Sequence, residues 1–530
     1  MRAEPGAGQS RTTSRRVAGN VLLSGLARAW SALTILVTVP IIVHGIGVSA
    51  YGIFTLINVL LGYVAFLDFG LTAAVVRSVA IHRSRGDAKA LERSIGTALT
   101  TLMALGVTGG AIIFVGAPFL VTSLFHVSAS LEADSIFAFR VAAFGFACNM
   151  TLIVFAAISQ GLQRLDVFAS RTVLLSTCNA AAQIAAVTLG GGLRWLAVVT
   201  VGLTVLSFAV FVLATRRLLP GVPIRPRFDR GSFRELTGFG SMRFLNQASA
   251  QATFQLDPVI IGAFLPIASV AFYAVPLNLT QKLMVLEDSV ASAFFPAAVD
   301  LHHRGEVDRL HQLYLSALKL VLVMMVFPAL VAVGYSWPIL AAWVGPSVAD
   351  HSASIFAVLA VAYAMASVLG IPSMAADATG HQRWTAGFAV ATAIINVVLS
   401  ILLVPRIGAI GPAWALLFNA CTEGTLFIWL VQHRFLRIPL GRVLRGAVVR
   451  PALSAAGLAI YLVLTAPHVR SPGTLVLAVV GALVLYLGLT LALRVWAANE
   501  LDVARRLLLG AAGSVRRRIG PAGQTRDRSQ

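Results

Sequence analysis

The stretch NVLLSGLARAWSALTILVTVP, residues 20–40, is apolar and long enough to cross a membrane, yet it carries one arginine. A helix of roughly 20 residues rises about 30 Å, which is the thickness of the hydrocarbon core of a bilayer. Arg28 lies near the middle of that length, where a charge facing lipid is expensive. The stretch therefore predicts a membrane-spanning helix whose arginine has a structural or functional partner.

Apolar runs of similar length recur along the whole chain. The chain is 58% hydrophobic and 12% charged, and soluble domains carry about 25% charged residues. The short alternating segments of a membrane β-barrel are absent from the sequence. We therefore expect an all-α polytopic membrane protein. The three cysteines fall inside apolar segments and lack the spacing of metal ligands, so no metal site is expected.

The apolar runs predict about 14 membrane-spanning helices, separated by charged residues or by Gly/Pro breaks. They lie near 18–43, 52–80, 95–121, 135–158, 167–189, 194–215, 238–264, 269–298, 313–335, 352–373, 384–404, 409–432, 450–466 and 474–494. This pattern predicts two six-helix lobes around a central cavity, followed by two C-terminal helices. The expected units are an N-terminal tail (1–17), an N-lobe (18–215), a linker (216–237), a C-lobe (238–432), a helix pair with its preceding loop (433–495) and a basic tail (496–530).

The formal net charge of +20 comes from basic residues that cluster in alternate loops. One set of loops holds nearly all of them, including residues 83–93, 216–234, 304–309 and 434–450. The other set contains only Arg194, Arg406 and Arg470. Cytoplasmic loops carry the excess of Lys and Arg, so we expect both termini in the cytoplasm. This distribution explains the charge without a nucleic-acid partner.

Four predicted helices carry several polar side chains. In the first and the seventh these recur at three- and four-residue spacing, which places them on one face of the helix. The four are the first two helices of each six-helix block, which predicts lobes of similar layout enclosing a polar cavity. The rows contain Asn20, Ser24, Arg28, Ser31, Thr34 and Thr38; Thr55, Asn58, Asp68, Thr72 and Arg77; Arg243, Gln247, Gln251 and Gln255; and Asn278, Gln281, Lys282, Glu287 and Asp288.

Three cations of these rows, Arg28, Arg243 and Lys282, fall around mid-membrane depth at ~1.5 Å of rise per residue. The fork of an arginine suits phosphate or carboxylate oxygens. We hypothesise that the three cations share a cavity that receives an anion, with Gln247 and Gln251 among the substrate-binding residues. Asn278 completes this predicted set. The structural alternative is that Arg28 pairs with an acid inside the membrane.

Four acids, Asp68, Asp257, Glu287 and Asp288, allow two interpretations. They bind a coupling proton or Na⁺, or they balance the charges of the cavity cations. The sequence leaves both open.

No catalytic constellation emerges from the sequence. A Walker A loop is absent, and the predicted outer loops are short and nearly free of charge. Membrane glycosyltransferases and polymerases usually need a large outer loop that bears acids, arginines or histidines. We therefore expect a protein that is not an enzyme and holds no cofactor.

Four stretches resemble polysaccharide repeat-unit flippases (O-antigen and exopolysaccharide) of the multidrug/oligosaccharidyl-lipid/polysaccharide exporter superfamily. YGIFTLINVLLGYVAFLDFGLTAAVVRSVA (51–80) is similar to the second-helix signature of that family. SQGLQRLDVFASRTVLL (159–175) and LDPVIIGAFLPIASVAFYAVPLNLTQKL (256–283) resemble its fourth-to-fifth-helix loop and its seventh and eighth helices. AADATGHQRWTAGFAVATAIINVVLSILLVPRIGAIGPAWA (375–415) is the closest match.

The resemblance implies an alternating-access protein of the bacterial inner membrane. Its substrate would be an undecaprenyl-diphosphate-linked oligosaccharide, flipped from the inner to the outer leaflet. By position, Arg28, Arg77, Arg243 and Lys282 would bind the diphosphate. Expected partners are the lipid-linked glycan, the bilayer and a polysaccharide polymerase or other assembly protein.

Three other functions stay open at this point. A lipid II flippase would use the same cavity chemistry. A multidrug-type, cation-coupled exporter would favour a cavity richer in acids. A membrane scaffold for a glycan-synthesis complex would not need polar rows inside the bundle.

Overall fold

The computed structural model describes residues 30–63, 67–162 and 165–496, and this part of the chain contains helices and turns but no strand. A helix over Trp30–Ile46 comes first. It is followed by α2 (Val48–Gly62), α4 (Leu71–Arg85), α5 (Ala88–Phe119), η1 (Leu120–Leu124), α6 (Ala129–Gly161), α7 (Leu165–Thr188) and α8 (Gly192–Leu218). Next come α9 (Arg230–Gln255), α10 (Asp257–Phe264), α11 (Ala268–Thr280), η2 (Gln281–Leu283), α12 (Met284–His303), α13 (Val307–Gly334), α14 (Ser336–Val344) and α15 (Pro346–Ala378). The last elements are α16 (Gln382–Ile407), η3 (Gly408–Ile410), α17 (Gly411–Leu430), η4 (Val431–Phe435), α18 (Leu440–Val443), η5 (Leu444–Val448), α19 (Val449–Thr465), η6 (Ala466–His468) and α20 (Pro472–Ala492).

Many of these helices have the composition of membrane spans. Within the described residues, 8 helical segments are long and apolar enough to cross a bilayer, and shorter apolar helices cover Trp30–Ile46, Val48–Gly62 and Val173–Thr188. The all-α, polytopic fold class is therefore confirmed. The count of about 14 spans stays a prediction, because several of the predicted spans consist of two or more shorter helices.

Three predicted spans are interrupted where the sequence suggested continuous helices. The span at 52–80 is α2 and α4, joined by a turn in which Phe69 and Gly70 have φ of 49° and 75°. The span at 238–264 is α9 and α10, which meet just before Pro258. The span at 269–298 is α11, η2 and α12. Each break places a charged residue in the interior of the bundle. These residues are Asp68 at the first break, Asp257 at the second and Lys282 at the third.

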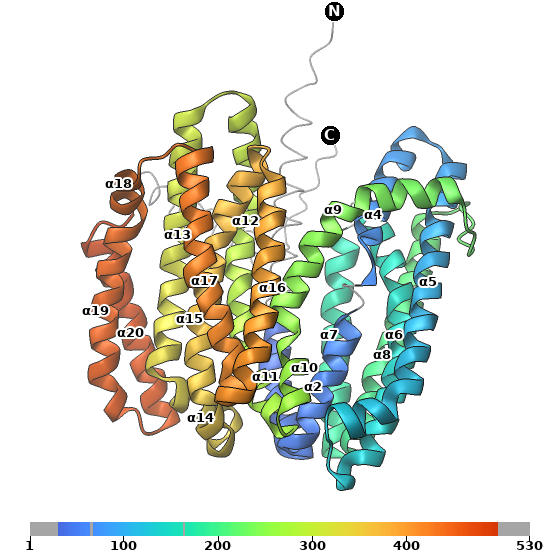
Figure 1. The fold of residues 1–530 in the computed structure, drawn as a ribbon, viewed down its shortest axis with the longest axis horizontal. Helices are drawn as coiled ribbons and strands as arrows, with labels where there is room; N and C mark the ends of the chain where they lie inside the picture. Colours follow the sequence, from blue (N-terminus) through green and yellow to red (C-terminus); the bar gives the residue numbers. More distant parts are fainter. Residues whose placement is uncertain (1–29, 64–66, 163–164, 497–530) are drawn as a thin grey trace, which may run out of the picture.

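The helices form two groups that meet at one end and lie apart at the other (Figure 1). The N-terminal group packs α5 on α6 and α6 on α8, and the C-terminal group packs α13 on α15 and α15 on α17. The groups join mainly through α2 and α11. The pair α19–α20 lies beside α13 on the outer flank of the second group.

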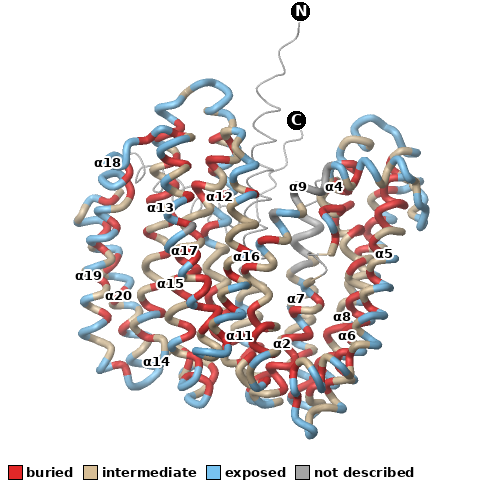
Figure 2. The backbone as a smooth tube through the Cα atoms, in the orientation of Figure 1, coloured by how far each residue is buried: buried red, intermediate tan, exposed pale blue. Residues whose placement is uncertain are grey.

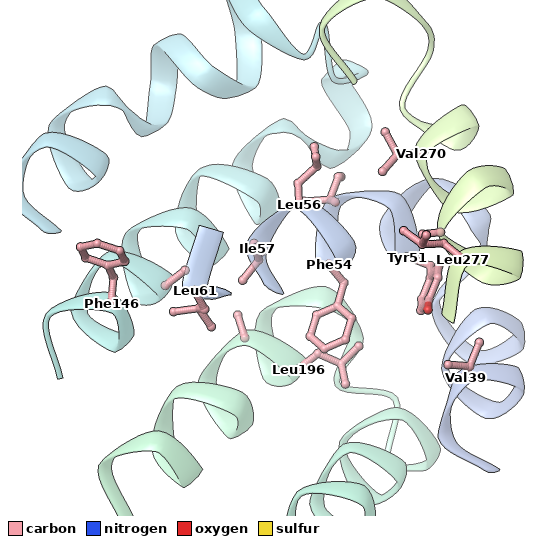
Figure 3. Packing of buried hydrophobic residues seen from close by; sticks show 14 of the residues in the cluster. Val39, Tyr51, Phe54, Leu56, Ile57, Leu61, Phe146, Leu196, Val270 and Leu277 are labelled. Atoms are coloured by element: carbon pink, nitrogen blue, oxygen red, sulfur yellow. The ribbon is translucent and has the colours of Figure 1, made fainter. Parts of the chain in front are cut away.

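The apolar core is continuous across the end where the groups meet. It contains Tyr51 and Ile57 from α2 and Val270 and Leu277 from α11, all of them buried. Figure 3 shows these side chains packed together at the junction. Buried positions gather at this junction, whereas α19 and α20 remain largely exposed or half-buried (Figure 2). Their exposed residues are aliphatic, as a lipid-facing surface requires.

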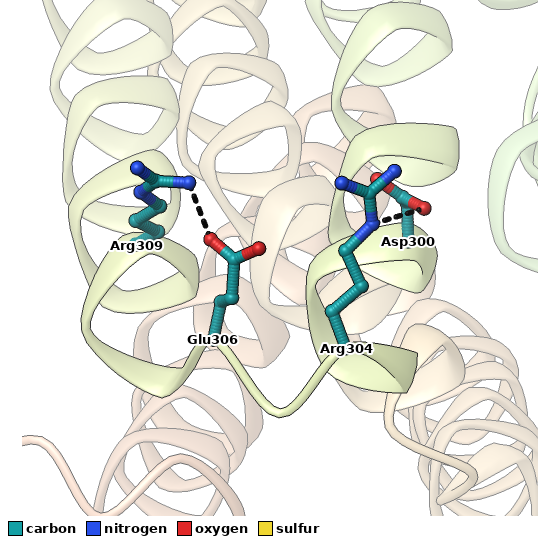
Figure 4. A network of polar contacts seen from close by, with 4 residues as sticks. All are labelled: Asp300, Arg304, Glu306 and Arg309. Atoms are coloured by element: carbon teal, nitrogen blue, oxygen red, sulfur yellow. Dashed lines mark hydrogen bonds and ion pairs between the residues drawn. The ribbon is translucent and has the colours of Figure 1, made fainter.

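The alternation of basic and neutral loops has a direct counterpart in the fold. The α4–α5 and α12–α13 turns and the α8–α9 linker lie at one end of the molecule, and the α7–α8 and α19–α20 turns lie at the other (Figure 1). At the α12–α13 turn, Arg304 pairs with Asp300 and Arg309 pairs with Glu306 (Figure 4). The groups lie apart at this basic end.

The linker and α9 connect the two groups physically. The backbone N–H of Arg227 donates to the Gly96 carbonyl oxygen at 3.3 Å, and that of Asp229 donates to Thr97 Oγ1 at 3.0 Å. A Cβ atom at Gly96 would lie 2.9 Å from the Arg225 carbonyl oxygen, so glycine permits this close crossing. From there α9 contacts α4 and α5 and then packs on α16 in the C-terminal group.

Candidate functional site

Three adjoining cavities lie between and within the two groups of helices. The largest, of about 680 Å³, is walled by α4 and α6, and we call it the α4 cavity. A second, of about 300 Å³, lies among the Trp30–Ile46 helix, α2, α7 and α11, and we call it the α2 cavity. A third, of about 280 Å³, lies beside Lys282, and we call it the Lys282 cavity.

The side chains of α9 connect these cavities. Gln247 lines both the α4 cavity and the Lys282 cavity. Gln255 lines both the Lys282 cavity and the α2 cavity, and Gln251 lies between them on the same helix. The four-residue spacing places the three amides on one face of α9. These three glutamines of the predicted polar row therefore line the cavities.

Lys282 stands where the helix between α11 and α12 is distorted. It lies in the one-turn 3₁₀ segment η2, and Pro276 precedes it in α11. Proline has no N–H to donate to the carbonyl four residues earlier, which is that of Phe272. The Phe272 carbonyl oxygen instead accepts a hydrogen bond from Ser352 Oγ at 2.8 Å.

The Lys282 cavity is the most clearly cationic of the three. Glutamines 247, 251, 255 and 281, the Tyr363 side chain, and apolar residues line it together with the ammonium group. No aspartate or glutamate is among its described lining residues. An anion that entered would meet one positive charge and several amide N–H donors.

Asp68 and Arg77 both line the α4 cavity. Oδ1 of Asp68 accepts a hydrogen bond of 2.9 Å from the Gly70 N–H, which fixes the carboxylate at the turn before α4. Arg77 is exposed on α4, two turns further along the helix. A predicted coupling acid and a predicted diphosphate ligand thus share one cavity.

Asn278 lines the α2 cavity together with Asn58 and Thr55. Its Nδ2 donates to the Ala274 carbonyl oxygen at 2.9 Å and to the Tyr51 hydroxyl at 3.4 Å. The second bond crosses from α11 to α2, so it lies at the junction of the two groups. This cavity has no charged group among its described lining residues.

Asp257 is enclosed within the C-terminal group. It is 2% exposed, and its carboxylate accepts hydrogen bonds from the Tyr273 hydroxyl at 2.6 Å and from Ser400 Oγ at 3.2 Å. Asn396 accepts a further bond from Ser400 at 3.3 Å. These donors are neutral, and the sequence alone did not indicate that they surround this acid.

Two further predicted acids, Glu287 and Asp288, do not line the three cavities. Glu287 is buried against Gly370 of α15, whose missing side chain makes room for the carboxylate. Asp288 is exposed on α12, and neither acid is among the cavity-lining residues. Arg28 lies outside the described residues. The side chain of Arg243 also lies outside them, although its backbone belongs to α9.

Several cavity residues escaped the sequence analysis. Asn149 and Gln160 of α6 line the α4 cavity, and Asn179 and Gln183 of α7 line the α2 cavity. Their signal was present but weak: Asn149 and Gln160 are eleven residues apart, which is close to three helical turns. A helix with two separated amides did not stand out beside the denser rows of α9 and α11.

Comparison with known proteins shows similarity to polysaccharide biosynthesis proteins. The family model described as "Polysaccharide biosynthesis protein" matches residues 17–302. The putative O-antigen transporter of Shigella flexneri is 23% identical over 404 residues, which cover 75% of this chain and 94% of that protein. The uncharacterized membrane protein EpsK of Bacillus subtilis (strain 168) is 25% identical over 427 residues, which cover 76% of this chain and 79% of that protein.

Solved structures share the fold at low sequence identity. The lipid II flippase MurJ in an inward closed conformation has a TM-score of 0.71 at 13% identity, covering 90% of this chain and 98% of that one. An inward-facing multidrug resistance MATE family transporter of the MOP superfamily has a TM-score of 0.64 at 16% identity, covering 78% and 100%. The structural likeness confirms the predicted fold class, and the sequence match covers more than half of the chain. The chain therefore belongs to the polysaccharide biosynthesis protein family.

Proposed function

We propose that this chain is a flippase that moves a polyprenyl-diphosphate-linked oligosaccharide repeat unit from the inner to the outer leaflet. The observation that carries the proposal is the Lys282 cavity, in which one ammonium group stands among glutamine amides with no acid in the described lining. The family to which the chain belongs and its similarity to a putative O-antigen transporter support the choice of a lipid-linked glycan as the anion.

In this proposal the diphosphate is held by Lys282, with Arg28 and Arg243 as further ligands. The first arginine and the side chain of the second lie outside the described residues, and their role rests on their sequence positions. Arg77 would contact the substrate from the α4 cavity. The polyprenyl tail would remain in lipid, because burying it in a polar cavity would forfeit its hydrophobic contacts.

The closed junction between α2 and α11 supports entry from the basic end of the molecule. Buried apolar residues fill this junction, and the two groups lie apart at the end with the arginine-rich loops. Since basic loops face the cytoplasm, the described conformation is inward-facing in this proposal. Rocking of the two groups would then open the junction and expose the glycan on the outer side.

The same reasoning extends to location and energy supply. We place the chain in the bacterial inner membrane with both termini in the cytoplasm, as a transporter and not an enzyme. H⁺ or Na⁺ would couple to transport through buried acids. Asp257 is the strongest candidate, because neutral donors alone surround its carboxylate in the described residues. A polymerase or another assembly protein would consume the delivered repeat unit.

Deletion of the gene in a bacterium that carries it tests the proposal. We expect loss of the surface or exported polysaccharide and accumulation of the lipid-linked repeat unit on the inner leaflet, both restored by a plasmid copy. Arg28→Ala on that plasmid should fail to restore export although the protein reaches the membrane. Unchanged lipid-linked sugars and unchanged polysaccharide would refute the function.

The deletion also separates the competing functions. A lipid II flippase would be needed for peptidoglycan synthesis, so its loss would stop growth instead of removing a dispensable polysaccharide. A multidrug exporter would leave both polymers intact and increase sensitivity to cationic drugs.

A further inference from the structure

The α4 cavity differs chemically from the Lys282 cavity, although Gln247 lines both. It is lined by a carboxylate (Asp68), a guanidinium (Arg77) and three amide side chains together with small and aliphatic residues. Its volume of about 680 Å³ lies within the range of small-molecule sites, roughly 300–1,000 Å³. A lining that mixes polar and apolar side chains suits a sugar, which has both hydroxyl groups and less polar C–H surfaces.

The backbone presents Asp68 to this cavity at some conformational cost. Phe69 adopts φ 49°, a left-handed conformation that aromatic residues rarely take, and Gly70 follows with φ 75°. The turn lets the Gly70 N–H bind Oδ1 of Asp68. Oδ2 of Asp68 has no hydrogen-bond partner among the described residues, so this cavity-lining carboxylate can accept a bond from a ligand.

The neighbouring amides have hydrogen-bonding capacity to spare. Nδ2 of Asn149 donates to the Leu61 carbonyl oxygen at 3.3 Å, which leaves its Oδ1 and a second N–H for a ligand. Gln160 lines the same cavity about three helical turns further along α6. Together with Asp68 these side chains supply both donors and acceptors for sugar hydroxyl groups along the cavity.

We propose that the α4 cavity is a sugar-binding subsite for a neutral pyranose ring, with Asp68, Asn149 and Gln160 binding its hydroxyl groups. The inference rests on the proposed function and assigns the two ends of the substrate to different cavities. The diphosphate lies at Lys282, where no acid opposes it, and the glycan extends past Gln247 into the α4 cavity. Asp68 disfavours an acidic sugar at its own end of the cavity, because two adjacent carboxylates repel each other. The Arg77 guanidinium lies two turns further along α4.

Binding of three synthetic lipids to the purified full-length protein tests this assignment. The lipids are undecaprenyl diphosphate, undecaprenyl diphosphate galactose and undecaprenyl diphosphate galacturonic acid, measured by native mass spectrometry or thermophoresis. We expect the galactose lipid to bind about five- to tenfold more tightly than the bare diphosphate, the factor that one or two hydrogen bonds supply. The galacturonic acid lipid should not show this gain.

Variants then locate the sugar. Asn149→Leu and Gln160→Leu should each reduce the preference for the galactose lipid and leave the affinity for bare undecaprenyl diphosphate unchanged. Asp68→Asn keeps an oxygen for the Gly70 N–H and should improve binding of the galacturonic acid lipid. Asn179→Leu makes the same chemical change in the α2 cavity and should preserve the galactose preference.

The outcomes separate the subsite from the function. If the unmodified protein binds all three lipids equally, or if Asn179→Leu removes the preference as fully as Asn149→Leu, the sugar subsite is wrong and the flippase function stands. If none of the three binds better than phosphatidylglycerol, the proposed function itself fails.

Discussion

The hydroxyl group of Tyr273 donates a 2.6 Å hydrogen bond to Oδ2 of Asp257, and both residues are buried. The bond joins α11 to the start of α10, where the chain turns before Pro258. Ser400 of α16 donates to the other carboxylate oxygen. Within the described residues no cation pairs with Asp257, so its charge depends on a proton, a bound cation or these neutral donors.

This arrangement predicts that Asp257→Asn uncouples transport from its ion gradient. The amide keeps one oxygen as an acceptor for one of the two hydroxyl groups and offers an N–H to the oxygen of the other, but it cannot carry a negative charge. We expect the stimulation of lipid flipping by a Na⁺ or H⁺ gradient in proteoliposomes to disappear, with the melting temperature within a few degrees of the parent. Tyr273→Phe should weaken the fold by about 1–3 kcal/mol, since it removes a buried donor. Full gradient stimulation in Asp257→Asn would exclude Asp257 as the coupling acid.

A second prediction concerns the charge at Lys282. Lys282→Gln should lower the transport rate at least about tenfold, because a charge-assisted contact to the diphosphate is worth roughly 1.5–3 kcal/mol. Lys282→Arg should retain much of the rate. The matched control is Lys89→Gln, the same change at an exposed position of α5. Equal transport by Lys282→Gln and Lys89→Gln would remove Lys282 from the substrate site.

The close contact between α2 and α11 predicts a conformational variant. A Cβ atom at Gly52 would collide with the Ile267 carbonyl oxygen, which is backbone and cannot move aside easily. Gly52→Val should therefore keep this junction from closing and shift the population toward an outward-open form. A cysteine introduced at Thr55, in the α2 cavity, should then react several times faster with an impermeant maleimide added from outside.

Gly202→Val is the control for that experiment, because a Cβ atom at Gly202 of α8 meets nothing within 4 Å. It should leave the labelling rate unchanged. If Gly52→Val labels no faster than Gly202→Val, the α2–α11 junction is not the outer gate.

The start of α9 predicts a pH-dependent contribution to stability. The backbone N–H of Ser232, bound to Asp229 at 2.7 Å, holds the pKa of that half-buried carboxyl below its usual value. A depressed pKa means that the stabilisation is complete above the unfolded value of about 3.9 and is lost as the pH falls through the folded value. Asp229→Asn, which caps the helix without the charge, should lose that pH dependence.

Thermal unfolding of both proteins between pH 3 and 7 measures this effect. The difference in melting temperature should be constant above about pH 4 and shrink below it. A difference that is the same at every pH would show that the cap acts without its charge.

The membrane spans were predictable because each segment must by itself be apolar and long enough to cross the hydrocarbon core. The predicted runs at 135–158 and 194–215 fall within α6 and α8. The interruptions were less visible: Asp257-Pro258 and Pro276 marked two of them, but the turn with Phe69 in a left-handed conformation has no comparable sequence signal. Its geometry depends on packing around α4.

The candidate site was predictable in part. The α9 row was found because spacing by four leaves little choice of face. Asn149 and Gln160 were missed because isolated amides in a long apolar helix have the same local pattern whether they face a neighbouring helix or a cavity. Their role depends on α4 and α9, which are distant in the sequence.

By itself, the sequence determined a helical membrane protein, the alternation of its basic loops and the polar rows of its interior helices. These follow from the local balance between apolar side chains and hydrocarbon and from the charge of each loop. Only the tertiary structure decided that Lys282 faces a cavity whereas Glu287, five residues later, is buried against Gly370. The physical reason is that the 3₁₀ segment η2 changes the helical rotation between them, and the packing of α12 on α15 then selects the side chain that lies at the interface.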